Sequence, residues 1–217
     1  GMPNLSSREW IVREYDHEVQ GRSVVKPLVG VRGDGPGDGA IVRPLDHSYR
    51  GLAITCGSNP EFGELDPYAM ATWGSDEALR NAVAVGADPT HAAILDNFSW
   101  GNCNMPDRLG SLTKAAFGCR DAALAYGTPF ISGKDSLNNE YRVGDRTLSI
   151  PPTLLISAIA PVPDVRHALT MDLKGGGTSV YLVGSSDARM GGSHYHLLRG
   201  VRGGTVPAPA LERAPAL

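Results

Sequence analysis

A carboxylate near the middle of the chain is a first candidate for chemistry. Asp96 lies in the segment LDNFSWGN (residues 95–102), directly after the apolar run of residues 92–95. Open α/β sheets place ligands beyond the carboxyl ends of such strands, and a carboxylate there can hold Mg²⁺ or accept hydrogen bonds from a base or a ribose. In the alternative interpretation, Asp96 and Asn97 only cap a turn before the next helix.

A second polar segment, ISGKDSLNNE (residues 131–140), follows another apolar run. Gly133 would let the backbone approach a phosphate, and Lys134 would neutralise its charge. Asp135 can bind a hard cation, and Ser136 can donate a hydrogen bond to a phosphate oxygen. The spacing is not that of a P-loop, and the alternative is a polar turn without a ligand.

Three further features carry weaker signals. The segment GDGA (residues 37–40) could cradle an anion, although Gly-Asp-Gly is also common in plain turns. His194 could act as a general base, although a single histidine is more often a surface residue. The three cysteines, Cys56, Cys103 and Cys119, form no CxxC pair, which fits reduced thiols better than a disulfide or zinc framework.

Hydrophobic periodicity predicts the elements that position these residues. We expect a short capped helix from Ser6 to about residue 17, with Trp10, Ile11 and Tyr15 inward. Longer helices are expected from Asp66-Pro67 to Gly86 and over residues 108–126. Strands are expected at residues 40–43, 52–55, 92–95, 129–132, 152–159 and 179–183.

The order of these elements predicts an α/β fold, a mixed β-sheet with its helices on one face. Both polar segments follow strands of this sheet. We therefore expect Asp96, Gly133, Lys134, Asp135 and Ser136 to gather within about 15 Å, the span of an ATP-sized cleft.

Three regions are predicted along the chain. Residues 1–30 form a helical lead-in and residues 31–172 form the main α/β domain. A glycine run at residues 175–177 marks the change to a third region, residues 173–217, which is too short for a core of its own. Its Pro- and Ala-rich tail from Gly203 is expected to be disordered.

The composition excludes several classes of partner. Of the 217 residues, 41% are hydrophobic and 20% charged, which is typical of a soluble globular protein. A net charge of -3 gives no indication of nucleic acid or of an anionic membrane. The sequence shows neither a signal peptide nor an apolar run approaching the roughly 18 residues that span a bilayer. We therefore expect a cytoplasmic protein.

Four motifs together resemble one enzyme family. The strings DPYAMATWGSDEALRNAVAVGADP, ILDNFSWGN, ISGKDSLNNE and MGGSHY occur in this order. Over roughly residues 7–198 the chain is similar to the second PurM-like half of the phosphoribosylformylglycinamidine synthase family, PurL. The resemblance implies a PurM (AIR synthase) N-terminal-like domain followed by the start of a C-terminal-like domain. It implies a ligase of purine biosynthesis that uses ATP, Mg²⁺ and glutamine-derived ammonia to convert formylglycinamide ribonucleotide to formylglycinamidine ribonucleotide.

Site residues carry over by their positions in these motifs. Asp96 matches an ATP-binding aspartate of the small bacterial form, Gly133 a glycine at the ATP site, and Ser136 a serine that contacts the substrate. Lys134 stands where that form has a magnesium-binding asparagine. Either the Lys134 ammonium replaces part of the cation's charge, or Asp135 takes the metal, since a protonated lysine cannot ligate Mg²⁺.

A second departure concerns catalysis. Where the first half of the family enzyme carries its catalytic histidine in a segment like ESHNHP, residues 55–60 here read TCGSNP. The resemblance therefore implies nucleotide and substrate contacts, no catalytic residue, and a chain that is inactive alone. The implied partners are the remainder of the synthase chain, a glutaminase subunit or domain, and the small-molecule nucleotide substrate. An uncovered sheet face would add a second copy of this chain, as a homodimer.

Two alternatives to the synthase stay open. One is another ATP-dependent kinase or synthase of the PurM superfamily, although the string ISGKDSLNNEY favours PurL. The other is a structural domain that only pairs with the rest of an enzyme. A nucleotide titration would distinguish this domain from the synthase and from the other PurM-superfamily enzymes.

Overall fold

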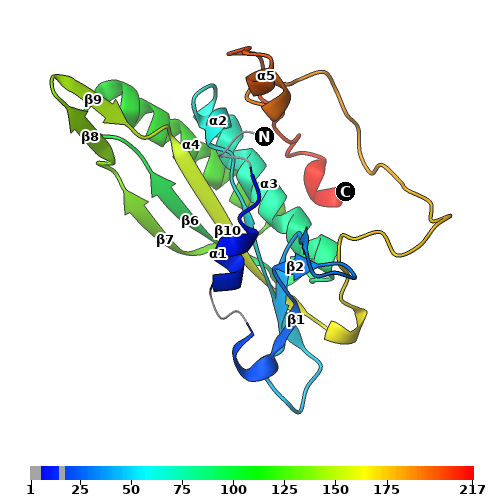
Figure 1. Cartoon of the computed structure of the whole chain (residues 1–217). Helices are drawn as coiled ribbons and strands as arrows, with labels where there is room; N and C mark the ends of the chain where they lie inside the picture. The colour runs from blue at the N-terminus through cyan, green and yellow to red at the C-terminus, as the bar shows by residue number, and fades with distance from the viewer. Residues whose placement is uncertain (1–5, 15–17) are drawn as a thin grey trace. The chain divides into compact units, whose positions relative to one another are not determined.

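The computed structural model describes residues 6–14 and 18–217 (Figure 1). The chain folds as two compact units, each built from segments that are distant in the sequence. The first comprises Gly1–Thr55, Arg80–His91 and Ile159–Ser179, and the second Cys56–Leu79, Ala92–Ala158 and Val180–Leu217. Strand β5 (Gly51–Gly57), helix α3 (Pro67–Val85) and strand β10 (Thr153–Val162) each contribute residues to both units.

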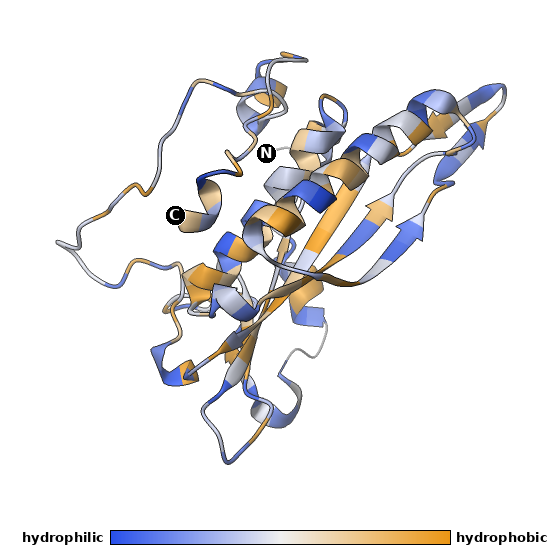
Figure 2. Cartoon of the chain, turned by 180° about the vertical axis from the view of Figure 1, so that it is seen from behind, coloured by the Kyte–Doolittle hydropathy of each residue, from blue (hydrophilic) through white to orange (hydrophobic). Residues whose placement is uncertain are grey.

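A six-stranded sheet has the strand order β1-β4-β5-β10-β6-β7. Strand β4 pairs with β5 antiparallel, whereas β6 pairs with β7 parallel, so the sheet is mixed as predicted. Strand β10 is central in this order, and Figure 2 shows it hydrophobic along most of its length. The strands not yet given are β1 (Ser23–Val25), β4 (Ala40–Val42), β6 (Ala93–Ser99) and β7 (Phe130–Ser136).

Two long helices, α3 and α4 (Pro106–Tyr126), lie on one face of the sheet, as predicted (Figure 1). Helix α3 starts where Asp66 accepts a hydrogen bond from the Ala69 amide at 3.1 Å, and α4 ends at Gly127, whose φ of 63° favours glycine. A side chain at Gly57 of β5 would overlap the Gly74 carbonyl of α3, so the sheet and the helix pack backbone against backbone.

The core lies between the sheet and these helices. Along β10, the alternate side chains of Leu154, Ile156, Ala158 and Ala160 are buried. On the other face of the sheet, Ile54 of β5 and Ile159 of β10 are exposed. This alternation is typical of a sheet with one covered face and one open face.

The remaining elements are short. Strands β2 (Leu28–Val29) and β3 (Gly35–Pro36) form one hairpin, and β8 (Glu140–Val143) and β9 (Arg146–Ser149) form another; the sequence predicted neither. The helical pieces are α1 (Glu9–Glu14), α2 (Pro60–Gly63), α5 (His194–Leu198) and the 3-10 turns η2 (Val19–Gly21), η3 (Pro89–His91), η4 (Val165–His167) and η5 (Ala214–Ala216). Within the described ranges, no helix is long and apolar enough to cross a membrane.

Strands β6 and β7 are longer than predicted. Their pairing continues to Ser99 and Ser136, so Asp96 and the Gly133–Ser136 stretch lie within strands and not in loops beyond them. The prediction ended both strands at the first polar residue. Backbone pairing between neighbouring strands extends both strands four residues beyond their predicted ends, in spite of the polar side chains.

The strand predicted over residues 179–183 is wrong. This segment has no regular structure, and the side chains of Val180, Tyr181, Leu182 and Val183 are 65–84% exposed. A strand needs a neighbour to pair its N–H and C=O groups, and the described residues place none beside this segment.

Both chain ends differ from expectation. Trp10 and Ile11 of α1 were expected to face inward but are exposed, because six residues form too short a helix to bury a face; Tyr15 lies outside the described residues. In the tail that was expected to be disordered, Val206 and Ala214 are buried. The predicted region boundaries near residues 30 and 172 stay predictions.

Candidate functional site

The register of β6 against β7 positions the candidate site. Asp96 pairs with Gly133, Phe98 with Asp135, and Ser99 with Ser136. Successive side chains of a strand point to opposite faces of the sheet. The structure therefore brings the candidates onto two neighbouring strands of one unit, but divides them between the two faces.

The helix-covered face carries Asp96, Gly133 and Asp135. Ile94 and Phe98, which flank Asp96 on this face, are buried. A Cβ added at Gly133 would lie 2.8 Å from Cγ of Asp96 and still closer to one of its carboxylate oxygens. The missing side chain at position 133 thus provides the space that the Asp96 carboxylate fills.

The Asp96 carboxylate is electrostatically unusual. Partial burial raises the pKa of Asp96, and the negative charge of Asp135 raises it further. Hydrogen bonds from the backbone amides of Asp96 and Lys134 lower the pKa but do not reverse the shift. A carboxylate that is costly to ionise and lies near a second carboxylate is suited to binding a cation, which offsets both penalties.

The open face carries Lys134 and Ser136. The Lys134 ammonium donates a hydrogen bond to the Ser136 hydroxyl, and Asn97 and Ser99 of β6 are their partners in register. Ser136 lies three residues beyond the partner of Asp96, an offset of about 10 Å along the strand. Lys134 and Ser136 are thus near Asp96 in space, but the sheet separates the two groups.

Strand β7 is an edge strand of the sheet, which leaves this pair of strands accessible from one side. Ser132, Gly133, Lys134 and Asp135 are all exposed. An open edge also offers backbone N–H groups to a ligand. The edge of β7 can therefore admit an anionic ligand beside the two carboxylates.

A cavity of about 470 Å³ begins directly after β6, in the same unit. Trp100, Gly101 and the first turns of α4 line it, with Arg108 and Lys114 as its cations. Arg108 forms an ion pair with Glu140 of β8, and the Trp100 amide donates to the Ser136 carbonyl at 2.8 Å. The cavity is of a size that holds small molecules. Its lining includes none of Asp96 and residues 133–136.

The segment TCGSNP forms the end of β5 and the start of α2. Asn59 caps α2, and the Ser58 amide donates to the Glu77 carboxylate at 2.9 Å. Burial and Glu77 raise the pKa of Cys56, so its thiol is less ionised than usual. These residues have structural partners and do not form an acid–base pair, in keeping with a segment that lacks the histidine.

The weaker candidates from the sequence, the segment GDGA, His194 and the cysteines, do not lie in an arrangement that would bind a ligand. A side chain at Gly39 would overlap Thr55, so close packing against β5 explains this glycine. His194 is exposed at the first turn of α5. Cys119 is buried in α4, and its pKa is raised to about 12 by burial and by the charge of Asp96. Throughout residues 6–14 and 18–217, no group of three or more His, Cys, Asp or Glu side chains is arranged to hold a metal.

Comparison with known proteins places the chain in a family context. Residues 36–160 match the profile of the AIR synthase related protein, N-terminal domain. The chain is 33% identical to phosphoribosylformylglycinamidine synthase subunit PurL of Thermoplasma acidophilum, over 96% of this chain and 27% of that protein. It is 35% identical to the subunit of the same name from Deinococcus radiodurans, over 98% of this chain and 28% of that protein. The chain thus spans about a quarter of the length of these relatives.

Solved structures give the same picture. The fold is similar to that of Thermotoga maritima PurL complexed with ADP, with a TM-score of 0.59 and 26% identity over 76% of this chain and 25% of that one. It is also similar to PurLQS from Thermotoga maritima, with a TM-score of 0.62 and 23% identity over 75% of this chain and 25% of that one. At that lower identity, the second likeness concerns the fold alone.

Proposed function

The chain belongs to the family of AIR synthase related proteins through their N-terminal domain, and we propose that it is the nucleotide-contacting part of a phosphoribosylformylglycinamidine synthase. In the reaction proposed, ATP transfers its γ-phosphoryl group to the amide oxygen of formylglycinamide ribonucleotide, leaving ADP, and ammonia from glutamine then displaces inorganic phosphate. The observation that carries the proposal is the set of Asp96, Gly133 and Asp135 on two paired strands. It is supported by the similarity to Thermotoga maritima PurL complexed with ADP.

The two carboxylates fit a magnesium ion bound together with ATP. Mg²⁺ commonly takes one or two protein carboxylates and completes its shell with phosphate oxygens and water. Asp96 and Asp135 lie on the same face, and burial together with the charge of Asp135 makes ionisation of Asp96 harder unless a cation is present. Bound Mg²⁺ would neutralise charge on the ATP phosphates. Asp96 and Asp135 would position it, and Gly133 would leave room for the Asp96 carboxylate.

The positions of the two side chains favour Asp135 over Lys134 as the residue that binds the metal. Lys134 lies on the opposite face from Asp96 and bonds to Ser136. An ammonium group on the opposite face of the sheet cannot replace the charge of a cation bound between the two carboxylates. Its hydrogen bond instead holds the Ser136 hydroxyl in place, which suits a contact of Ser136 with the ribonucleotide substrate on the open face.

Nucleotide titration tests this role. Calorimetry with ATP and Mg²⁺ should show binding to the full chain, and Asp96→Asn and Asp135→Asn should each weaken it by about tenfold or more, the usual effect of losing a charged contact. Asp145→Asn is the matched control, because Asp145 is an exposed carboxylate in the turn between β8 and β9 of the same unit. Absence of ATP binding, or equal weakening by all three variants, would favour a purely structural domain.

The chain alone should not synthesise formylglycinamidine ribonucleotide. Residues 55–60 supply no histidine, and loss of a positioned acid or base typically removes about 10²–10⁴-fold of the rate. The partners proposed are the rest of the synthase chain and a glutaminase subunit or domain, in the cytoplasm. Turnover of the isolated chain with ATP, ammonia and substrate at the rate of a complete PurL would contradict this.

We place the start of a following domain at residues 173–217. The exposed apolar segment at residues 180–183 supports it, because such a strand-forming run would pair with segments further along a longer protein. The open sheet face around Ile54 and Ile159 should likewise be covered by another half of the enzyme or, in the isolated chain, by a second copy. Light scattering at micromolar concentration tests the homodimer, and the mass of a single chain would refute it.

A further inference from the structure

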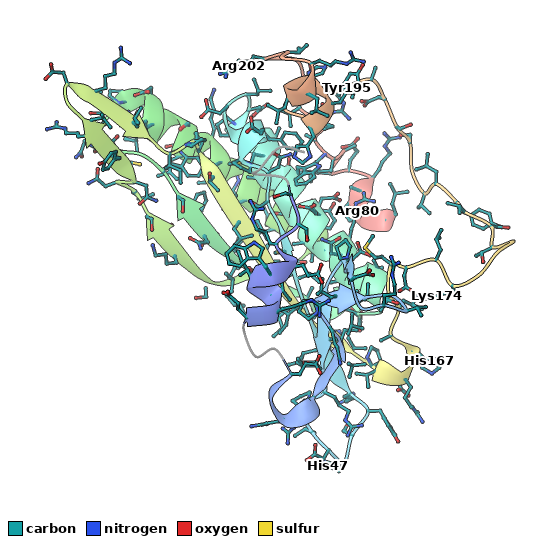
Figure 3. All side chains as sticks on the ribbon, in the orientation of Figure 1. His47, Arg80, His167, Lys174, Tyr195 and Arg202 are labelled. Carbon is teal, nitrogen blue, oxygen red and sulfur yellow. The ribbon has the colours of Figure 1, made fainter. Side chains whose placement is uncertain are left out.

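A second cavity, of about 560 Å³, lies in the first unit and takes no part in the proposed function. Its charged lining residues are three arginines and one aspartate, Arg22, Arg43, Arg166 and Asp46. Arg22 directly precedes β1, Arg43 directly follows β4, Asp46 lies in the loop after β4, and Arg166 belongs to the turn η4. His47 and His167 mark that loop and that turn in Figure 3. The lining therefore carries an excess of positive charge.

The aromatic ring of Tyr49 contacts two of the arginines. The guanidinium carbon of Arg166 lies 4.1 Å from the centre of the Tyr49 ring, and that of Arg43 lies 5.7 Å from it. Both distances are within the range of a cation–π contact. The two guanidinium groups are therefore no more than about 10 Å apart and are positioned before any ligand arrives.

The third arginine is also fixed. Arg22 donates to the Pro44 carbonyl at 2.6 Å and to the Asp46 carboxylate at 3.2 Å. Its backbone carbonyl accepts a hydrogen bond from the Arg43 amide at 2.9 Å, which ties the two residues together. Hydrogen bonds thus hold the side chain of Arg22, and contacts with the Tyr49 ring position those of Arg43 and Arg166.

The positive charge is only partly neutralised. Arg166 is paired with Asp164, whose pKa is lowered to about 2 by that contact, and Arg22 is paired with Asp46. Arg43 makes no ion pair with a carboxylate in the part of the chain that the structure describes. Three clustered guanidinium groups repel one another, and an anion between them would remove that repulsion.

We propose that this cavity binds a small phosphate-bearing anion between Arg43 and Arg166, with Arg22 as a third contact. Guanidinium groups match phosphate oxygens through paired N–H donors, and arginine is the preferred residue where such recognition is needed. The cavity of about 560 Å³ has room for a phosphate or a diphosphate, and the two guanidinium groups, at most about 10 Å apart, are close enough for one anion to contact both. The ring of Tyr49 keeps the two arginines in the cavity and does not itself contact the phosphate.

Direct binding to the full chain tests the proposal with pyrophosphate, inorganic phosphate and glycerol 3-phosphate as separate probes. In NMR spectra of the arginine side chains, the Nε–H signals of Arg43 and Arg166 should shift on titration with at least one probe. Tighter binding of pyrophosphate than of phosphate assigns the site to a diphosphate. Tighter binding of glycerol 3-phosphate assigns it to a phosphate monoester.

Variants make the test specific. Arg43→Gln and Arg166→Gln should each weaken binding of the tightest probe by about tenfold or more. Arg142→Gln is the matched control, since it removes the same charge from an exposed position on β8 in the other unit. Asp96→Asn, which disturbs the proposed ATP site, should leave this binding unchanged. The proposal is overturned if no probe shifts the two Nε–H signals, or if Arg142→Gln weakens binding as much as Arg43→Gln.

Discussion

Replacing Gly133 with alanine should destabilise the junction of β6 and β7. The new Cβ would lie 2.8 Å from Cγ of Asp96, where ordinary contacts begin at 3.4 Å. Asp96 has a short side chain on a paired strand, so only a rotation of its carboxylate can relieve the overlap. Overpacking of this kind costs about 1–3 kcal/mol, and the φ of Gly133 is not positive, so alanine regains about 0.4–1 kcal/mol from the unfolded state. The net loss should be about 1–2 kcal/mol.

A double-mutant cycle isolates this contact. The three heavy atoms nearest to the added Cβ belong to the Asp96 carboxyl group, and Asp96→Ala removes them. In that background, Gly133→Ala should be neutral or slightly stabilising in urea unfolding. Gly110→Ala is the control, because a Cβ there on α4 meets no atom within 4 Å and should stabilise the helix by up to about 1 kcal/mol. An equal loss from Gly133→Ala with and without Asp96 would refute the reasoning.

Three further predictions concern titration, thiol reactivity and a helix contact. Burial and the charge of Asp135 raise the pKa of Asp96 above 3.8, so the ionised carboxylate destabilises the folded state. Asp96→Asn should therefore raise the urea midpoint at pH 7, and this gain should vanish as the pH falls toward 3.8. A gain that does not depend on pH would contradict the raised pKa. Cys119 is buried with a pKa raised to about 12, so iodoacetamide at pH 8 should modify exposed Cys56 first, and mass spectrometry showing equal rates would contradict the burial. Tyr68→Phe removes a 2.9 Å hydrogen bond from α3 to Asp121 of α4 and should cost about 0.5–1.5 kcal/mol, so an unchanged midpoint would count against that bond.

The long helices and most of the main sheet could be predicted from local signals. Asp66 and Pro67 start α3, and Gly127 ends α4, because capping depends on residues next to one another. The ends of β6 and β7 could not be predicted in this way, since polar side chains lower strand propensity while pairing with a neighbour extends the strand. Ile94 and Phe98 lie four residues apart and are both buried, as alternation along a strand requires, and this spacing was the available signal for the length of β6.

The candidate residues were found from the sequence, but their division between two faces was not. Once β7 is a strand, alternation requires that Lys134 and Asp135 point to opposite faces. The Arg108–Glu140 pair and the contact of Arg166 with Tyr49 had no local signal, because the partners are 32 or more residues apart in the sequence. The run at residues 180–183 shows the converse: strong local propensity without a partner forms no strand.

In the proposed function, nucleotide binds at the paired strands β6 and β7. Backbone NMR of the full chain, titrated with a non-hydrolysable ATP analogue and Mg²⁺, locates the ligand residue by residue. The largest amide shifts are expected at Asp96, Gly133 and Asp135, with smaller ones at Ser136. Binding that instead shifts the residues lining the cavity at the start of α4, and leaves these four unchanged, would contradict it.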